Sequence, residues 1–408
     1  MKHDSDVLIA GGGLNGPALA LALAQAGLRV TVVDAQPARA RANEGFDGRA
    51  YALAIASQRL LAAIDVWPAV AADAQPILRV RAADGRAGES PSPLALNFDS
   101  AELEGGPLGY MLEDRFLARA LADAMVASPR ITLICATSVI AQEPELVGIN
   151  ATLSDGRTLT ARVLVGADGR RSSVAERAGI TRTGWGYGQT ALVCALEHEQ
   201  PHHGVAQQVF LPTGPLALLP LLGNRTSIVW SETDANARTL AALPDADFLA
   251  LLRERLPPGL GEVQLIGPRF SYPLNLTLAN AYTAARVALA GDAAHGVHPV
   301  AGQGLNLGLR DVAVLAEVLV EAHRRGEDIG AANVLARYQG HRRFDATALA
   351  LGMDGVNRLF SNDNPLLRAG RDIGLGLVQS MPMLRRAFMR QAAGLLPDPP
   401  RLLAGQKL

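Results

Sequence analysis

Hydrophobic positions along the chain form short runs of strand length and longer stretches with helical spacing. The N-terminal segment "DVLIAGGG" is a short apolar run that ends in glycines, "LNGPALALALAQAGL" has helical length, and "RVTVVDA" is a second, β-branched run. Branched apolar runs favour strands, whereas a longer stretch rich in Ala and Leu favours a helix. The first 34 residues therefore predict a strand–helix–strand unit.

The middle of the chain alternates between the same two patterns. "MLEDRFLARALADAMVAS" predicts a helix, two strands are expected around Ile131–Cys135 and Val139–Ala141, and "GINATLSDGRTLTARVLVGADG" predicts a hairpin that turns at Asp155. Residues 189–232 hold four strand-length runs separated by Gly and Pro, which predicts an antiparallel sheet. A helix and a further strand follow, and from about Gly304 the pattern is helical to the end.

This order of elements predicts an α/β protein of two interleaved domains. The expected fold is a Rossmann-like dinucleotide-binding domain interleaved with an antiparallel-sheet substrate domain and followed by a C-terminal helical segment. The predicted boundaries assign residues 1–75, 111–180 and 281–345 to the first domain, 76–110 and 181–280 to the second, and 346–408 to the helical segment.

Composition narrows the function classes. A chain of 408 residues exceeds one ordinary hydrophobic core, and 49% hydrophobic content describes a folded protein. The net charge of −1 gives no reason to expect a nucleic-acid partner, and two cysteines are too few for a disulfide framework or a metal site. We see no export signal and no run of about 18 apolar residues that would cross a membrane, so a cytoplasmic location is expected.

The motif "GGGLNG" fits the dinucleotide-binding pattern at the position where the pattern is meaningful, between a strand and a helix. Gly11 allows the tight turn, Gly13 lets a pyrophosphate approach the backbone, and Gly16 lets the helix pack against the strand. Asp34 ends the next strand, where a carboxylate binds ribose hydroxyls and disfavours a 2′-phosphate. The site is therefore expected to bind FAD or NAD.

Two later stretches also place an acid and glycines at the end of a strand. "VLVGADGRRSSV" brings Asp168 into a turn, and "RVALAGDAAHGVHPVAGQGLNLGLRD" brings Gly291 and Asp292 there before a helix begins near Gly304. Each stretch alone is also compatible with an ordinary structural turn. Together with the first motif, they have the spacing expected of three loops that bind one extended ligand.

The combination resembles the class A flavoprotein monooxygenases, and the long third motif is similar to the branch of ubiquinone-biosynthesis aromatic hydroxylases. The resemblance runs from Asp6 to about Asp345. It implies FAD as cofactor, NADH or NADPH and O2 as co-substrates, and hydroxylation of an electron-rich phenolic ring through a flavin C4a-hydroperoxide. The expected substrate is a polyprenyl-phenol intermediate of ubiquinone biosynthesis.

The resemblance also assigns roles to residues. Gly11, Gly13, Gly16 and Asp34 would bind the ADP part of FAD, and Arg49 would lie near its phosphates. Arg115 would contact the flavin, and Asp168 would belong to the loop that faces FAD and the nicotinamide donor. Gly291 and Asp292 would hold the ribityl chain. The isoalloxazine ring would be lined by Pro299, Gly302, Gln303, Gly304, Leu305 and Asn306. No catalytic residue is certain; the candidates are His295, His298 and Pro299, and a structural role is an equal alternative for each histidine.

Several alternatives stay open from the sequence alone. Another flavoenzyme on the same scaffold, a reductase or a halogenase, is one, and a non-catalytic FAD-binding member of a quinone-biosynthesis complex is another. The basic, apolar segment Asn357–Arg390 is compatible with peripheral contact at the inner face of an anionic membrane, with packing on the domain core or with a homodimer contact.

Overall fold

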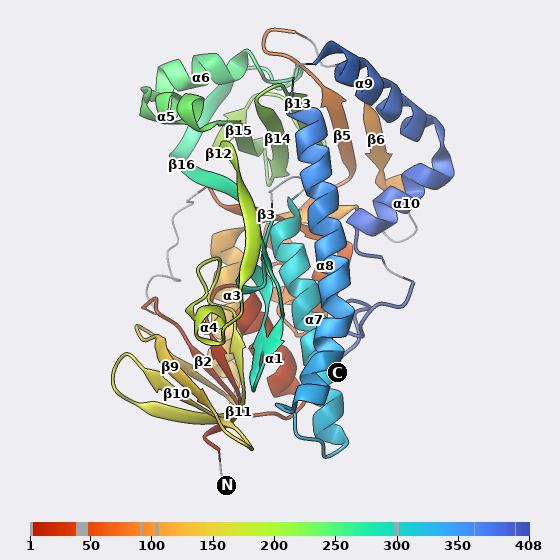
Figure 1. Ribbon diagram of the computed structural model, residues 1–408. Coiled ribbons are helices and arrows are strands. Elements are labelled where there is room, and N and C mark those ends of the chain that lie inside the picture. The colour runs from red at the N-terminus through yellow and green to blue at the C-terminus, as the bar shows by residue number, and fades with distance from the viewer. Residues whose placement is uncertain are drawn as a thin grey trace.

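Two large β-sheets occupy opposite ends of the molecule, and long helices run beside them (Figure 1). The structure is a computed structural model that describes residues 3–37, 48–89, 92, 94–102, 106–297, 302–362, 364–395 and 397–408. The predicted class, a Rossmann-like parallel sheet combined with an antiparallel sheet and C-terminal helices, is confirmed.

The first sheet has a parallel core of five strands. In spatial order they are β18 (Val287–Leu289), β11 (Thr158–Gly166), β1 (Ser5–Ala10), β2 (Val30–Val33) and β8 (Ile131–Ile134). The edge beside β18 is β17 (Thr283–Ala284). The predicted hairpin forms from β10 (Ile149–Leu153) and the start of β11, and the separately predicted strand β9 (Val139–Pro144) pairs with β10. All four residues of β2 are buried, as a continuous apolar run predicts for a strand of a covered parallel sheet.

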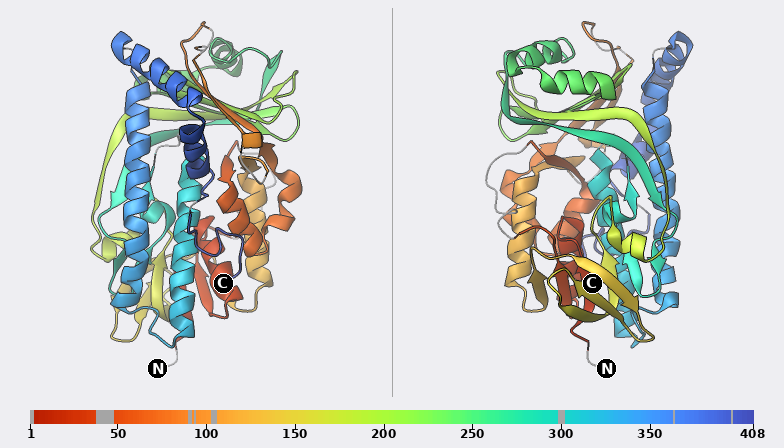
Figure 2. Two further views of the ribbon diagram at one scale, coloured as in Figure 1. Left: turned by 90° about the vertical axis from the view of Figure 1, so that its right-hand side faces the viewer. Right: turned by 60° about the vertical axis from the view of Figure 1, so that its left-hand side comes forward.

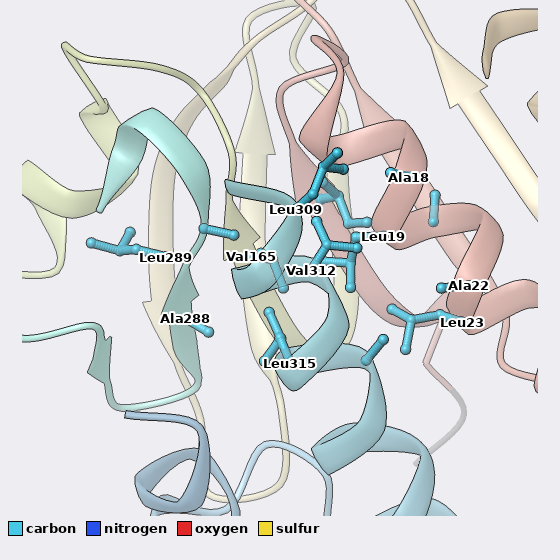
Figure 3. Close-up of a cluster of buried hydrophobic side chains, with 14 of the residues drawn as sticks. Ala18, Leu19, Ala22, Leu23, Val165, Ala288, Leu289, Leu309, Val312 and Leu315 are labelled. Atoms are coloured by element: carbon cyan, nitrogen blue, oxygen red, sulfur yellow. The ribbon is translucent and has the colours of Figure 1, made fainter. Parts of the chain in front are cut away.

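Two helices pack together against this sheet. They are α1 (Asn15–Gln25), which follows β1, and α7 (Gln303–Arg324), which comes nearly 300 residues later in the chain. Figure 3 shows Leu19 and Leu23 of α1 beside Leu309, Val312 and Leu315 of α7. All five side chains are buried, so the packing fixes the start of each helix relative to the strand ends.

The second sheet is almost wholly antiparallel. Its order is β19 (His295–Gly296), β16 (Val263–Ala279), β12 (Arg182–His198), β15 (Arg225–Thr233), β14 (Gly214–Leu221), β13 (Val205–Leu211), β5 (Arg79–Asp84) and β6 (Leu96–Asp99). The four strands predicted within residues 189–232 are therefore confirmed, and β5 pairs parallel to β13. Helices α5 (Asp234–Ala242) and α6 (Asp245–Arg253) lie at this end of the molecule (Figure 1).

A small third sheet joins the two ends. It consists of β3 (Ala50–Ala54), β7 (Gly109–Glu113) and β4 (Gln75–Ile77). Helix α2 (Ile55–Ala63) follows β3 directly, and α3 (Asp114–Ala127), which was predicted, follows β7. The remaining short elements are α4 (Ser173–Arg177), η2 (Trp67–Ala69), η3 (Ala71–Asp73), η4 (Ser100–Glu102) and η5 (Gly291–Ala293).

The C-terminal part is helical, with α8 (Ala332–Phe360), α9 (Pro365–Ser380) and α10 (Pro382–Ala392) (Figure 2). The domain boundary predicted at residue 345 lies inside α8, which is one continuous helix. A buried ion pair, in which Arg371 Nη2 lies 2.8 Å from Asp84 Oδ1, fixes α9 to β5. Near the chain end, Leu402 and Leu403 join the main hydrophobic core. The helical segment therefore packs on both sheets.

Candidate functional site

Three loops with the predicted motifs follow three neighbouring parallel strands. β11 lies between β1 and β18, so the turns after Ala10, Gly166 and Leu289 emerge side by side at one edge of the sheet. The backbone ties them together, because Ala167 N donates to Ala10 O at 2.8 Å and Ala290 N donates to Gly166 O at 2.9 Å. The carboxyl ends of parallel strands are where open α/β sheets bind ligands. The structure thus brings together loops that lie more than 100 residues apart in the chain.

The glycines of the first loop meet different surroundings. A Cβ atom on Gly11, whose φ is +110°, would lie 2.2 Å from Ala167 O, and one on Gly16 would lie 2.0 Å from Gly11 O. A Cβ on Gly13 would meet no atom within 4 Å, and this residue is exposed. Gly11 and Gly16 therefore serve close packing, whereas Gly13 leaves open space before the start of α1. This shape fits the pyrophosphate of a dinucleotide, with the N–H groups of α1 facing it.

Asp34 lies at the carboxyl end of β2 and is buried. Its Oδ1 accepts a hydrogen bond from Gln36 N at 3.0 Å, and its own backbone N–H donates to Ile134 O at 2.8 Å. These bonds fix the carboxylate at the edge of the glycine-rich turn. The position is the one that ribose recognition requires.

The second and third loops meet through an ion pair. Asp168 Oδ2 accepts from Val174 N at 3.1 Å and organises its own loop, while its Oδ1 is buried without a hydrogen-bond partner among the described residues. Arg170, in the same loop as Asp168, donates from Nε to Asp292 Oδ2 of the third loop at 3.2 Å. Both partners of this pair are nearly half exposed, so Asp292 stays accessible beside the strand ends.

The start of α7 is held against β3. Gly302, with φ of +62°, adopts the left-handed conformation before the helix, and a Cβ there would lie 2.9 Å from Ala52 Cβ. Asn306 accepts from Ala54 N at 2.8 Å and Ser57 Oγ at 2.7 Å, and it donates to the carbonyls of Ala52 and Gly302. Its amide group is thus fully used in joining the two elements. Gln303 is buried, whereas Gly304 and Leu305 are half-buried.

A buried acid that the sequence analysis did not assign fixes the third loop. Asp311 Oδ2 accepts from Gly291 N at 2.9 Å and lies 2.6 Å from His295 Nε2, while its Oδ1 accepts from Arg342 Nε at 2.7 Å. Burial raises the pKa of Asp311, but His295, Arg342 and their hydrogen bonds together hold it below its usual value. The signal in the sequence was an acid among the apolar positions of α7, where Leu307, Val312 and Leu315 are also buried.

This arrangement defines the position of His295 more sharply than the sequence did. The imidazole is completely buried, in contact with Asp311 rather than open to the strand-end loops. Its Nδ1 has no hydrogen-bond partner among the described residues. His298 and Pro299, the other two catalytic candidates, lie outside the described residues.

The two candidate arginines are both engaged by acids. Arg49 Nη2 lies 2.9 Å from Asp114 Oδ2, and half of its side chain is exposed. Tyr51 donates to the other oxygen of Asp114 at 2.9 Å, and burial together with that carboxylate raises the pKa of Tyr51. Arg115 donates from Nε to the buried Glu113 at 2.7 Å. Arg115 is therefore directed toward Glu113. The second oxygen of Glu113 lies 3.2 Å from Nη2 of Arg225, on β15.

A cavity of about 220 Å³ lies beside the start of α7. Its wall combines α7, the third sheet, the antiparallel sheet and α10, and its polar side chains are Gln207, Gln208, Gln303 and Asn306. No Asp, Glu, His, Lys or Arg belongs to the lining that the described residues form. An uncharged, largely apolar molecule is therefore the ligand that this cavity suits.

The described residues contain no group of three or more His, Cys, Asp or Glu side chains arranged to hold a metal ion. Among the helices of the described part, none combines the length and apolar character needed to cross a bilayer.

The parallel sheet, the three strand-end loops and the adjoining apolar cavity define a flavoprotein hydroxylase. The family model described as "FAD binding domain" matches residues 4–350, and the chain belongs to this family. FAD is its cofactor, with O2 and a reductant as co-substrates, and the protein is an FAD-dependent monooxygenase. The resemblance inferred from the motifs is confirmed.

Two curated relatives narrow the branch. The chain is 49% identical over 407 residues to ubiquinone hydroxylase UbiL of Rhodospirillum rubrum, with 99% of this chain and 94% of the relative covered. It is 38% identical to 3-demethoxyubiquinol 3-hydroxylase of Escherichia coli, with coverage of 97% and 100%. The chain therefore belongs with the ubiquinone hydroxylases of the family.

Solved structures agree on the fold. p-Nitrophenol 4-monooxygenase PnpA from Pseudomonas putida superimposes with a TM-score of 0.79 at 20% identity, over 96% of this chain and 98% of that one. At this identity the likeness establishes the architecture alone.

Proposed function

We propose that the protein hydroxylates the phenolic ring of a prenylated precursor of ubiquinone. The observation that carries the proposal is the apolar cavity at the start of α7, which has no ionisable side chain among its described lining residues. A ring with a hydrocarbon tail suits such a wall. The names of the two relatives, a ubiquinone hydroxylase and a demethoxyubiquinol hydroxylase, support the same substrate class.

The three strand-end loops would hold the cofactor. Gly13 and Asp34 would bind the ADP part, Gly11 and Gly16 would shape the turn that receives it, and Asp292 would accept a hydrogen bond from the ribityl chain. The open space at Gly13 and the accessibility of Asp292 support these roles. When bound, FAD supplies acceptance of reducing equivalents and activation of O2.

The chain itself would position the ring and exclude water. The amide of Asn306 joins β3 to α7 and so keeps the cavity wall beside the first turn of that helix. The free N–H groups at the start of α7 and the helix dipole favour negative charge there. The apolar wall keeps bulk solvent from the ring.

We further propose NADH or NADPH as the reductant and the cytoplasm, at the inner face of the membrane, as the place of action. Both follow from the expected chemistry of a prenylated substrate and a flavin hydroxylase. The relatives' names, a ubiquinone hydroxylase and a demethoxyubiquinol hydroxylase, support a role in ubiquinone chemistry.

The test uses FAD-loaded protein, NADH or NADPH, air and a series of prenylated phenols with short tails. We expect oxidation of the nicotinamide coupled to a product that is heavier by one oxygen atom, as measured by mass spectrometry. Absence of product with every phenol and both nicotinamides would contradict the proposal. Oxidation of the nicotinamide without oxygen insertion would indicate a reductase instead.

A further inference from the structure

Helix α10 has two faces with different surroundings. Met389 and Ala393 are buried, and both line the cavity at the start of α7 together with Ala392. The opposite face carries Met383, which is 88% exposed, and Phe388, which is 50% exposed. One short helix thus lies between the substrate cavity and the outside of the molecule.

Exposed hydrophobic side chains are concentrated in this part of the chain. More than half of the exposed large hydrophobic side chains among the described residues lie between Phe344 and Phe388. In α10, positions 383, 384, 387 and 388 are all exposed, and this spacing places them on one face of the helix. Exposed apolar side chains gathered on one face of a helix indicate an interaction site.

The charged side chains of α10 itself have a single sign. The segment Pro382–Ala392 contains three arginines and no acidic residue. Arg385 is directed inward to Glu102, with Nη2 2.6 Å from Oε2. Arg386 and Arg390 are exposed and form no ion pair with any described residue. Apolar side chains flanked by free arginines match a surface of anionic lipid headgroups over hydrocarbon.

The helix is anchored on its inner side. Besides the pair of Arg385 with Glu102, Ala56 N donates to Ala393 O at 3.1 Å and Arg310 Nη2 donates to Gln391 O at 3.2 Å. Gln379, in the helix before it, accepts from Asn97 N at 2.8 Å. These bonds keep the apolar face directed outward while the inner face stays on the cavity.

We propose that α10 is a docking surface for an anionic lipid bilayer, through which the hydrocarbon tail of the substrate reaches the cavity. This deepens the proposed function and rests on it for the identity of the tail, but not for the lipid contact. Met383, Leu384 and Phe388 enter the headgroup region, and Arg386 and Arg390 bind lipid phosphates. Docking places the cavity wall formed by Met389 and Ala393 next to the layer that holds the tail.

The first experiment measures partition of the FAD-loaded protein onto vesicles by sedimentation. We expect binding to vesicles with 30% phosphatidylglycerol in phosphatidylcholine, and at least about tenfold weaker binding to pure phosphatidylcholine. The double variant Met383→Asp, Phe388→Asp is expected to lose at least about tenfold in partition to the anionic vesicles. Val126→Asp, at a position that is 75% exposed on α3, is the matched control and is expected to bind like the wild type.

Three results would overturn the proposal: equal binding to both vesicle types, no binding to either, or unchanged binding of the double variant. A wild type that dimerises in solution through this face, while the double variant is monomeric and neither binds lipid, would assign the surface to a second copy instead. Equal FAD content of all variants verifies that they are folded.

The second experiment separates this inference from the proposed function. With a short-tailed, water-soluble phenol, the double variant is expected to match the wild type. With a long-tailed phenol in anionic vesicles, its kcat/KM is expected to fall at least about tenfold. An equal loss on both substrates would overturn the entry role. If no phenol is hydroxylated by the wild type, the proposed function fails, while the vesicle data still decide the lipid contact.

Discussion

The carboxylate of Asp311 lies 2.6 Å from His295 Nε2, and both side chains are fully excluded from solvent. The same carboxylate binds Gly291 N, so it holds the residues on both sides of Asp292. An acid on α7 therefore determines the shape of the loop that follows β18. His295 and Asp311 act as positioning residues for this loop.

Replacement of Asp311 by Asn is expected to lower the free energy of unfolding by about 3 kcal/mol, because the buried guanidinium of Arg342 loses one of its two carboxylate partners and keeps only the partly exposed Asp345. Retention of FAD should fall as the loop loosens. Urea unfolding and the ratio of flavin to protein measure the two effects. Asp65→Asn, which removes an exposed pair with Lys407, is the control and should cost less than about 1 kcal/mol.

The contribution of Asp311 has a defined pH dependence. Because the folded-state pKa is below the unfolded value of about 3.9, this stabilisation is complete at neutral pH and is lost as the pH falls below about 4. The difference in unfolding free energy between the wild type and Asp311→Asn should therefore shrink only in strong acid. A difference that already shrinks between pH 8 and 6 would show that another group is responsible.

Two glycines of the first loop should respond differently to the same substitution. Gly11→Ala is expected to lower stability by more than about 2 kcal/mol, since its Cβ would overlap Ala167 O in a left-handed backbone conformation. Gly13→Ala should fold normally but bind FAD about tenfold more weakly, a loss of about 1.4 kcal/mol, because the methyl group enters the open space before α1. Thermal unfolding and flavin titration of the apoprotein separate the two. Normal FAD affinity of Gly13→Ala would contradict the assignment of the pyrophosphate position.

Asp292→Ala is expected to weaken FAD binding about tenfold or more, the size of a lost hydrogen bond to a charged acceptor. Arg170→Ala removes the partner of Asp292 but leaves the carboxylate in place. Since that pair is nearly half exposed, this control should change FAD affinity less than about threefold. If both variants lose FAD equally, the ion pair and not a contact with the ribityl chain explains the effect.

Filling the cavity tests its role in substrate binding. Ala82→Phe places a ring in the space beside α7, so KM for the phenol should rise at least about tenfold while FAD content stays unchanged. Ala127→Phe, at an exposed position on α3, is the matched control. Unaltered KM in the cavity variant would place the substrate elsewhere.

The two free cysteines should differ in reactivity. Burial raises the pKa of Cys194 to about 12, whereas Cys135 is half-buried. At pH 8 a thiol reagent should modify Cys135 in the native protein and Cys194 only after unfolding. Because the folded-state pKa is raised, the stability due to the neutral thiol is present below pH 9 and is lost as the pH rises toward 12. Cys194→Ala should remove this alkaline loss, which pH-dependent unfolding measures.

The sequence by itself determined the local elements and the chemistry of the loops. Glycine spacing after a strand, an acid at the end of the next strand and the hairpin turn at Asp155 depend on contacts within a few residues, so their patterns are readable along the chain. The family and its cofactor followed from the same motifs. The contact surface at α10 was only one of several interpretations of an apolar, basic tail.

Only the tertiary structure decided which loops meet and what each polar side chain binds. The order of strands places β11 between β1 and β18, and sequence spacing does not specify that order. Asp311 of α7 forms an ion pair with Arg342 of α8, and Arg115 forms one with Glu113. The side-chain amide of Asn306 forms hydrogen bonds with β3. The sequence also did not predict that α8 continues across the boundary at residue 345, because helix periodicity does not report which domain a helix contacts. Long-range packing fixes these relationships, and a local pattern carries no record of it.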